Sequence, residues 1–319
     1  MKKIFDLSKY EVLEQHYAKL IYWVVVALVA FTFFVSWSQS NLIKTDSDSF
    51  VQIQRSYKNA GIDTKQALNK KYTVQSKGNQ VSISNDLKYT YVKVQNDIAA
   101  MQPQNGINQI LGSSMFIIFP LIMMIYAIST AYFDLNNRTL KVKVTHSGIQ
   151  PIVIAKLFGL FLSAFITLTI LCVAFEFFQF GFRSLESIPT DVPINYTMIN
   201  GTSYLSSAPI QFLSTLVLAC LMITISYYLT LLIRSSILPM IIVGVYYLLI
   251  PTLGRFDYKQ NIILLYSKLF RGTAVTYTPA PVGGSFSFIS FAICVITLVI
   301  SIVIMNYVIT RKGFLTRKF

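Results

Sequence analysis

One polar, basic segment, residues 132–156, lies between two long apolar runs. No residue from 98 to 133 and none from 157 to 175 carries a charge, whereas the segment contains Asp134, Arg138, Lys141, Lys143, His146 and Lys156. A charged connector of this kind lies at a membrane surface, and its excess of Lys and Arg predicts the cytoplasmic surface. The chemistry that these side chains offer is polar contact, either with a partner protein or with lipid headgroups.

Residues that could carry out catalysis are scarce. The chain has two histidines, His16 and His146, and no His, Cys, Asp and Glu set at metal-ligand spacing. It contains neither HExxH nor the phosphate-binding motif GxxxxGK[ST]. The three cysteines, Cys172, Cys220 and Cys294, all lie in apolar runs, which indicates packing residues rather than disulfides. The sequence therefore predicts no enzyme activity, no cofactor and no metal site in this chain.

The composition is typical of a protein that crosses a membrane several times. Its 319 residues are 54% hydrophobic and 13% charged, whereas soluble domains carry about 25% charged residues. Uncharged runs of about 20 residues recur, each long enough to cross a hydrocarbon layer of about 30 Å as a helix. We attribute the formal net charge of +14 to topology and anionic lipid, because the inner loops are too short to form a nucleic-acid-binding domain.

We predict an all-α membrane protein with six transmembrane helices. The predicted spans are residues 20–38, 109–133, 152–182, 210–233, 237–253 and 286–309. Residues 1–19 precede them, and their apolar spacing predicts an interfacial helix on the inner leaflet. Residues 254–285 contain an apolar patch too short to cross, which we interpret as a re-entrant piece before the sixth span.

Residues 39–108 form the one sizeable segment between spans, and we predict that they are extracellular. A segment of this length is translocated largely regardless of its charge. Residues 50–68 have helical character, and residues 72–83 alternate like a β-hairpin with its turn at 77–79. The low apolar content of the segment predicts little core of its own.

The basic residues place both termini in the cytoplasm. The predicted inner segments hold four basic residues at the N-terminus, four in the connector 134–156, one at Arg234 and four in the C-terminal tail. The two short outer loops hold one and four. This is the positive-inside pattern of a multi-pass plasma-membrane protein, and the high usage of Lys, Asn, Ile and Tyr indicates a bacterium.

Glu176 is the acidic residue of the third predicted span. It lies about 24 residues from the inner end, which at 1.5 Å per residue places it at the outer interface. Two interpretations stay open, an ordinary interfacial residue and a role in transport.

The order of these elements resembles the permease subunit of ABC transporters, in particular the type-2 (type V exporter) family. The second span ends in Tyr132-Phe133-Asp134, followed by Asn137-Arg138-Thr139-Leu140-Lys141 and later by Lys156. In that family an acidic residue, Thr-Leu-Lys or Thr-Ile-Lys, a Ser-rich turn and a Lys that opens the next span mark the coupling helix, which docks into the ATPase. The residues that the resemblance assigns to coupling are Asp134, Arg138, Thr139, Leu140, Lys141, Lys143, Ser147 and Lys156. Arg138 stands where many members have Gly, and Gln150-Pro151 where many have a basic residue.

The resemblance implies a helix in this connector, whereas the residues alone favour a strand. Leu140, Val142 and Val144 alternate with Lys141 and Lys143, which is a period of two. The two expectations therefore disagree about residues 139–144.

The resemblance also implies the function and the partners. We expect a permease that exports an amphipathic or hydrophobic substrate, such as a peptide or a lipid-like molecule. Its partners would be ABC ATPase subunits, a second permease copy or homologue, and membrane lipid, with no nucleic acid. ATP and Mg²⁺ would be bound by the separate ATPase, and its force would enter through residues 134–156. The alternative is a membrane sensor or immunity component that detects an extracellular peptide.

Overall fold

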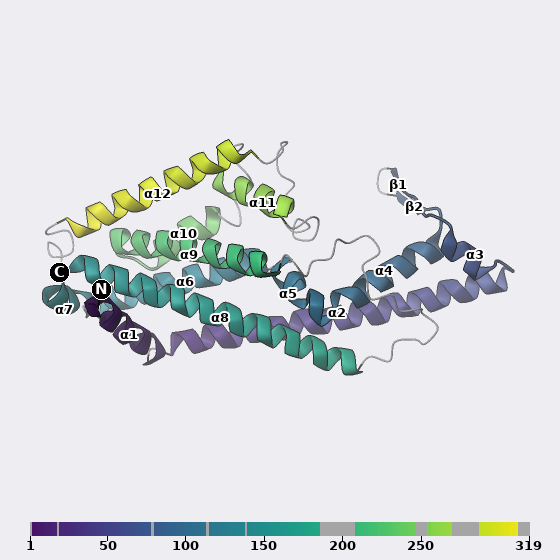
Figure 1. Cartoon of the computed structure of the whole chain (residues 1–319), viewed down its shortest axis with the longest axis horizontal. Helices are drawn as coiled ribbons and strands as arrows, with labels where there is room; N and C mark the ends of the chain where they lie inside the picture. Colours follow the sequence, from purple (N-terminus) through teal and green to yellow (C-terminus); the bar gives the residue numbers. More distant parts are fainter. Residues whose placement is uncertain are drawn as a thin grey trace. The chain divides into compact units, whose positions relative to one another are not determined.

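The structure is a computed structural model, and it describes residues 2–17, 19–77, 80–112, 115–137, 139–185, 208–246, 254, 256–269 and 287–311. These residues form α-helices, apart from one short β-hairpin (Figure 1). They belong to two compact units, and helices α2 and α8 contribute to both. The first unit comprises Met1–Leu28, Ile110–Leu171 and Pro209–Phe319, and the second comprises Val29–Gln109 and Cys172–Ala208.

Among the residues that the structure describes, five helices are long and apolar enough to cross a membrane. They are α2 (Leu20–Asn59), α6 (Met115–Asn136), α8 (Ile149–Leu185), α9 (Ala208–Ile233) and α12 (Phe288–Thr310). The chain is therefore a helical, membrane-embedded protein, as the composition predicted. Of the predicted span 237–253, the structure describes the helix α10 (Ile237–Gly244), and residues 247–253 lie outside the described part.

Helix α2 is longer than the sequence predicted. The first span was expected to end at residue 38, but the helix continues through the polar residues that follow, because no Gly or Pro interrupts residues 20–59. It ends just before Gly61, which has a left-handed backbone (φ +70°). There the N–H of Ile62 donates to the carbonyl of Tyr57 at 3.0 Å, a hydrogen bond typical of glycine-terminated helices.

The second unit has an apolar core that the sequence did not predict. Ile43 and Phe50 of α2 pack with Leu87, Val94 and Ile98 of α4 (Asp86–Ala100), and the short helix α3 (Thr64–Asn69) adds to this cluster. The expectation of little core was wrong because the continuation of α2 supplies one side of the cluster.

The predicted hairpin of the second unit is confirmed. Strand β1 (Val74–Lys77) pairs antiparallel with β2 (Gln80–Ile83), with Val74 opposite Ile83 and Lys77 opposite Gln80. Residues 78 and 79 of the predicted turn lie outside the described residues. The second unit also contains most of α5 (Pro103–Gly112).

The core of the first unit joins four helices. Met124 and Ile128 of α6 pack against Leu218 and Met222 of α9, with Val243 of α10 and Ile262 of α11 (Tyr258–Leu269). Helix α11 also contacts α12. At 1.5 Å per residue α11 is about 18 Å long, too short to cross a bilayer. It covers part of the predicted re-entrant stretch 254–285, and residues 270–286 lie outside the description.

The connector between α6 and α8 is a helix, α7 (Thr139–Ser147). The period-two pattern of its residues was therefore misleading, and the helix implied by the family resemblance is correct. An isolated strand leaves its backbone N–H and C=O groups unpaired, whereas a helix pairs them within itself. Gly148 (φ +82°) ends α7, with its N–H donating to the carbonyl of Val144 at 2.9 Å. Helix α8 begins at the next residue, so a single glycine separates the two helices.

Candidate functional site

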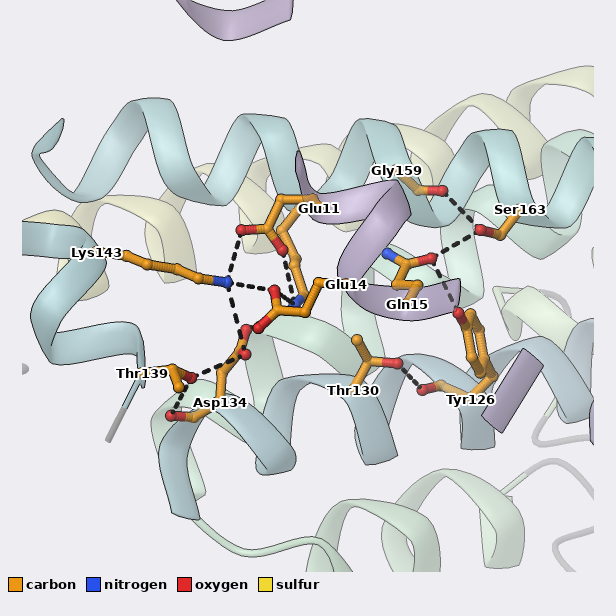
Figure 2. Close-up of polar contacts among 11 residues, drawn as sticks. Glu11, Glu14, Gln15, Tyr126, Thr130, Asp134, Thr139, Lys143, Gly159 and Ser163 are labelled. Carbon is orange, nitrogen blue, oxygen red and sulfur yellow. Dashed lines mark hydrogen bonds and ion pairs between the residues drawn. The ribbon is translucent and has the colours of Figure 1, made fainter. Parts of the chain in front are cut away.

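The candidate site begins with one face of α1 (Lys2–Tyr17). Glu11, Glu14 and Gln15 stand at positions i, i+3 and i+4, so their side chains lie on the same side of the helix. That side faces α6, α7 and α8 within the first unit (Figure 2). We call Glu11, Glu14, Asp134, Lys143 and Lys156 the charge cluster.

Lys156 stands at the centre of the charge cluster. Its ammonium lies 2.7 Å from a carboxylate oxygen of Asp134 on α6 and 2.8 Å from one of Glu11 on α1. A further 3.7 Å contact reaches Glu14. Asp134 lies in the last turn of α6, where the helix dipole disfavours a negative charge, and the ammonium of Lys156 offsets that effect. One lysine of α8 thus binds both α6 and α1.

Lys143 connects α7 to the same cluster. Its ammonium donates to Glu11 at 2.8 Å and also to Glu14, and it lies 3.9 Å from Asp134. Figure 2 shows Glu11, Glu14, Asp134 and Lys143 converging. The surface helix α7 is therefore tied to α1 by two ion pairs.

The pKa shifts indicate that Glu11 and Lys143 of the charge cluster are ionised. Burial alone would raise the pKa of Glu11, but the charge of Lys156 and the hydrogen bond from Lys143 outweigh it, so the pKa is lowered. Burial and the neighbouring Lys156 would lower the pKa of Lys143, but Asp134, Glu11 and Glu14 outweigh them and raise it. Both groups are therefore charged near neutral pH, as ion pairs require.

A neutral network continues from the cluster along α1. The hydroxyl of Tyr126 donates to Gln15 Oε1 at 2.9 Å, and the hydroxyl of Ser163 lies 2.7 Å from the same oxygen. Gly159 of α8 allows this close approach. A Cβ atom at Gly159 would lie 3.2 Å from Gln15 Nε2 and 3.7 Å from Glu11 Cβ, so a larger residue would push α1 away from α8.

The predicted coupling residues have different environments. Asp134, Lys143 and Lys156 come together in the charge cluster. The hydroxyl of Thr139, at the start of α7, donates to Asp134 Oδ1 at 3.2 Å, and Ser147 is half-buried at the end of α7. Arg138 and the side chain of Lys141 lie outside the described part of the chain.

Leu140 requires a correction. The sequence suggested that it is an apolar contact for a partner, but its side chain is 2% exposed and so is already buried within this chain. The exposed apolar side chain of α7 is Val142, at 61%. On a short helix packed on one side, residues two positions apart point in nearly opposite directions. Leu140 therefore faces the rest of the chain, and Val142 is the apolar side chain that a partner could contact.

Sequence reasoning missed the contribution of α1. The N-terminal segment was interpreted as an interfacial helix from its apolar and basic residues. No contact was predicted for Glu11 or Glu14. The spacing of these two carboxylates and Gln15 on one helix face was the available signal. It could not identify the partners, because they lie more than 100 residues away in the sequence.

Glu176 does not belong to this site. It lies in the second unit against Gly106 of α5, where a Cβ atom would come within 2.4 Å of its Oε1 and 2.7 Å of Gln179 Oε1. The backbone N–H of Ile107 donates to the Glu176 carboxylate. At 1.5 Å per residue it stands about 30 Å along α8 from Lys156, one hydrocarbon thickness away. The two interpretations of Glu176, an ordinary interfacial residue and a role in transport, stay predictions.

The ion pairs of the charge cluster connect α1, α6, α7 and α8 mechanically. Among the residues that the structure describes, no three His, Cys, Asp or Glu side chains form a group that could hold a metal ion. Comparison with protein-family models, with curated proteins and with solved structures finds no match.

Proposed function

We propose that this chain is the permease subunit of an ATP-driven ABC exporter, in which α7 receives mechanical force from a separate ATPase. The observation that supports the proposal is the attachment of α7. Lys143 ties it to α1, and Lys156 ties α1 to both apolar helices that flank α7. A displacement of this one surface helix would therefore reach three other helices.

The two sides of α7 are suited to different tasks. The inner side carries the buried Leu140 and the paired Lys143, while Val142, Thr145 and His146 are exposed. A partner that contacts the exposed side would push on a helix whose opposite side is bound to α1 by ion pairs. The pairs of Lys156 with Asp134 and Glu11 are buried, and removing one member of such a pair costs about 3–5 kcal/mol. A push on α7 should therefore move α1, α6 and α8 together.

The finer parts of the proposal follow from the sequence. Six spans with both termini in the cytoplasm of a bacterium, as the sequence predicts, would put α7 on the side where ATP is available. A second permease copy or homologue would complete the transport path, and ATP and Mg²⁺ would be bound by the ATPase. The apolar character of the candidate spans supports an amphipathic or hydrophobic substrate, such as a peptide or a lipid-like molecule.

Site-specific photo-crosslinking tests the predicted ATPase contact. A photoreactive amino acid at Val142, introduced into the full chain in its native membrane, should crosslink to a P-loop ATPase. The same residue at Val173, which is 63% exposed on the candidate span α8, is the matched control and should crosslink to lipid. Crosslinking of Val142 to lipid alone would contradict the proposed role of α7.

Substitutions in α7 test coupling separately from folding. Val142→Asp changes an exposed residue, so it should leave the melting temperature within a few degrees and reduce substrate-stimulated ATP hydrolysis of the complex. Leu140→Asp places a charge in a buried position and should lower the melting temperature itself. Normal stimulated hydrolysis in Val142→Asp would argue against this contact.

The second unit supports a second candidate function, detection of an extracellular peptide. Its own apolar core, around Phe50 and Leu87, is sufficient to hold a binding surface. Peptide binding by the purified chain without any ATPase, and its loss when the core is disrupted by Leu87→Asp, would favour a sensor over an exporter.

A further inference from the structure

A cavity of about 260 Å³ lies beside the charge cluster in the first unit. Leu20, Phe133 and Tyr126 form its apolar walls, and Glu14 and Lys156 lie at its polar edge. It is smaller than the 300–1,000 Å³ typical of pockets for drug-sized ligands. Its size therefore suits a small charged group attached to an apolar body.

The five side chains of the charge cluster do not balance one another. The charge cluster has three carboxylates, Glu11, Glu14 and Asp134, but two ammonium groups. Asp134 and Glu11 are almost fully buried and both contact Lys156. Glu14 is 30% exposed and is the carboxylate that lines the cavity. The five side chains of the charge cluster thus carry a net charge of −1. Glu14, which Lys143 and Lys156 also contact, is the carboxylate through which a further cationic group in the cavity would reach the cluster.

The surroundings of the cavity suit a lipid headgroup. Leu20 opens the apolar stretch of α2, and the preceding Lys19 is an exposed cation in a left-handed backbone conformation (φ +58°) at the corner between α1 and α2. Phe133 is 48% exposed, so an acyl chain could lie against it. A cation for a phosphate, an anion for an ammonium and apolar walls therefore occur within one corner of the unit.

We propose that this cavity binds the headgroup of a phospholipid with a primary ammonium, of the phosphatidylethanolamine class. The ammonium would donate hydrogen bonds to Glu14, the phosphate would lie near Lys19, and the upper part of an acyl chain would pack on Leu20 and Phe133. A primary ammonium has hydrogen-bond donors, whereas the trimethylammonium of phosphatidylcholine has none, so the site distinguishes the two lipids. This inference does not depend on the chain being a transporter.

Lipid binding is tested with the purified full chain in nanodiscs that differ only in headgroup. Because a ligand that binds only the folded state raises its stability, phosphatidylethanolamine should raise the melting temperature above that in phosphatidylcholine or phosphatidylglycerol with the same acyl chains. Native mass spectrometry should show one phosphatidylethanolamine retained. Equal melting temperatures and equal retention of all three lipids would overturn the proposal.

Three variants locate the binding to this cavity. Glu14→Gln should lower the preference for phosphatidylethanolamine over phosphatidylcholine about tenfold, as expected for one charge-assisted hydrogen bond. Asp48→Asn removes an exposed carboxylate of α2 that does not line the cavity. This variant should keep the preference for phosphatidylethanolamine. Ser129→Phe fills the cavity, whose wall includes Ser129, without changing any charge.

Ser129→Phe decides the question if Glu14→Gln fails to fold. It should abolish the retained lipid while keeping the ion pairs of the charge cluster. A folded Ser129→Phe protein that still selects phosphatidylethanolamine would place the binding outside this cavity and overturn the inference.

Discussion

Asp134 and Lys156 face each other across 2.7 Å, and each side chain is 2% exposed. The pair joins the last turn of α6 to the beginning of α8, the two helices on either side of α7. A buried pair of this kind is retained only where every charge meets an opposite charge. Here Glu11 supplies the second anion for Lys156 at 2.8 Å, so α1 belongs to the same structural unit.

Removal of Lys156 should therefore be costly. Lys156→Met leaves the buried Asp134 without its close cation and leaves Glu11 with Lys143 alone. We expect a loss of about 3–5 kcal/mol in the free energy of unfolding. Thermal or denaturant unfolding in detergent measures it. Adding Asp134→Asn to Lys156→Met should recover part of the loss, because one unpaired charge disappears.

The matched control for this prediction is Lys44→Met, which removes an exposed cation from α2. It should change the free energy of unfolding by no more than about 0.5 kcal/mol. A Lys156→Met protein as stable as Lys44→Met would show that the buried pair contributes nothing.

The approach of α1 to α8 should depend on Gly159. In Gly159→Leu the added side chain would collide with Gln15 and Glu11, so the amides of α1 should exchange hydrogen faster. Gly181, also on α8, has nothing within 4 Å of its Cβ position, and Gly181→Leu is the matched control. Unchanged exchange of α1 in Gly159→Leu would disprove the close contact.

The second unit should lose stability as the pH rises. Burial, and then the hydrogen bond and charge of Asp46, raise the pKa of Asp97 from 3.8 to about 7, although Lys93 opposes the shift. The folded unit then holds a proton that the unfolded chain releases near pH 4. The stabilisation is complete below about pH 4 and is lost as the pH rises through about 7.

Unfolding followed by circular dichroism between pH 4 and 8 measures this effect. Asp97→Asn, which is neutral at every pH, should flatten the dependence, whereas the exposed Asp48→Asn should not. The same pH dependence in Asp97→Asn and the parent would assign the proton to another group.

The predicted orientation can be tested with single cysteines. In a background without the three native cysteines, a cysteine at Ala60 should react with a membrane-impermeant thiol reagent in intact cells, and one at Thr145 should react only after lysis. Both positions are exposed, so accessibility within the fold does not limit the reaction. Labelling of Thr145 in intact cells would reverse the topology and remove α7 from the cytoplasm.

The apolar candidate spans were predictable because each depends on a local, continuous signal. The predicted bounds of the spans 152–182 and 210–233 fall within a few residues of α8 and α9. The end of α2 was not predictable from hydropathy. The residues change from apolar to polar near Ser38, which changes the surroundings of the helix, but the helical backbone continues to Asn59. Gly61, where the helix does end, is a conformational signal instead.

The candidate site was also predictable only in part, but the reason differs from that for the end of α2. Lys143 and Lys156 were singled out as cations, but their partners Glu11 and Glu14 lie on a segment far away in the sequence. The roles of Leu140 and Val142 depend on which side of α7 meets α1. No property of the nine residues of α7 determines that side.

The ion pairs of α7 also constrain how the protein is made. Glu11 leaves the ribosome 132 residues before Lys143, a delay of about 7–26 s at translation rates of about 5–20 residues per second. During that time the carboxylates of α1 have no lysine partners from α7 or α8, so α1 has to remain in contact with water. If the predicted topology holds, we expect Lys143 and Lys156 to act first as positive charges that orient the neighbouring helices and to pair with α1 only afterwards. The charges that direct insertion would then be the same charges that later complete the fold.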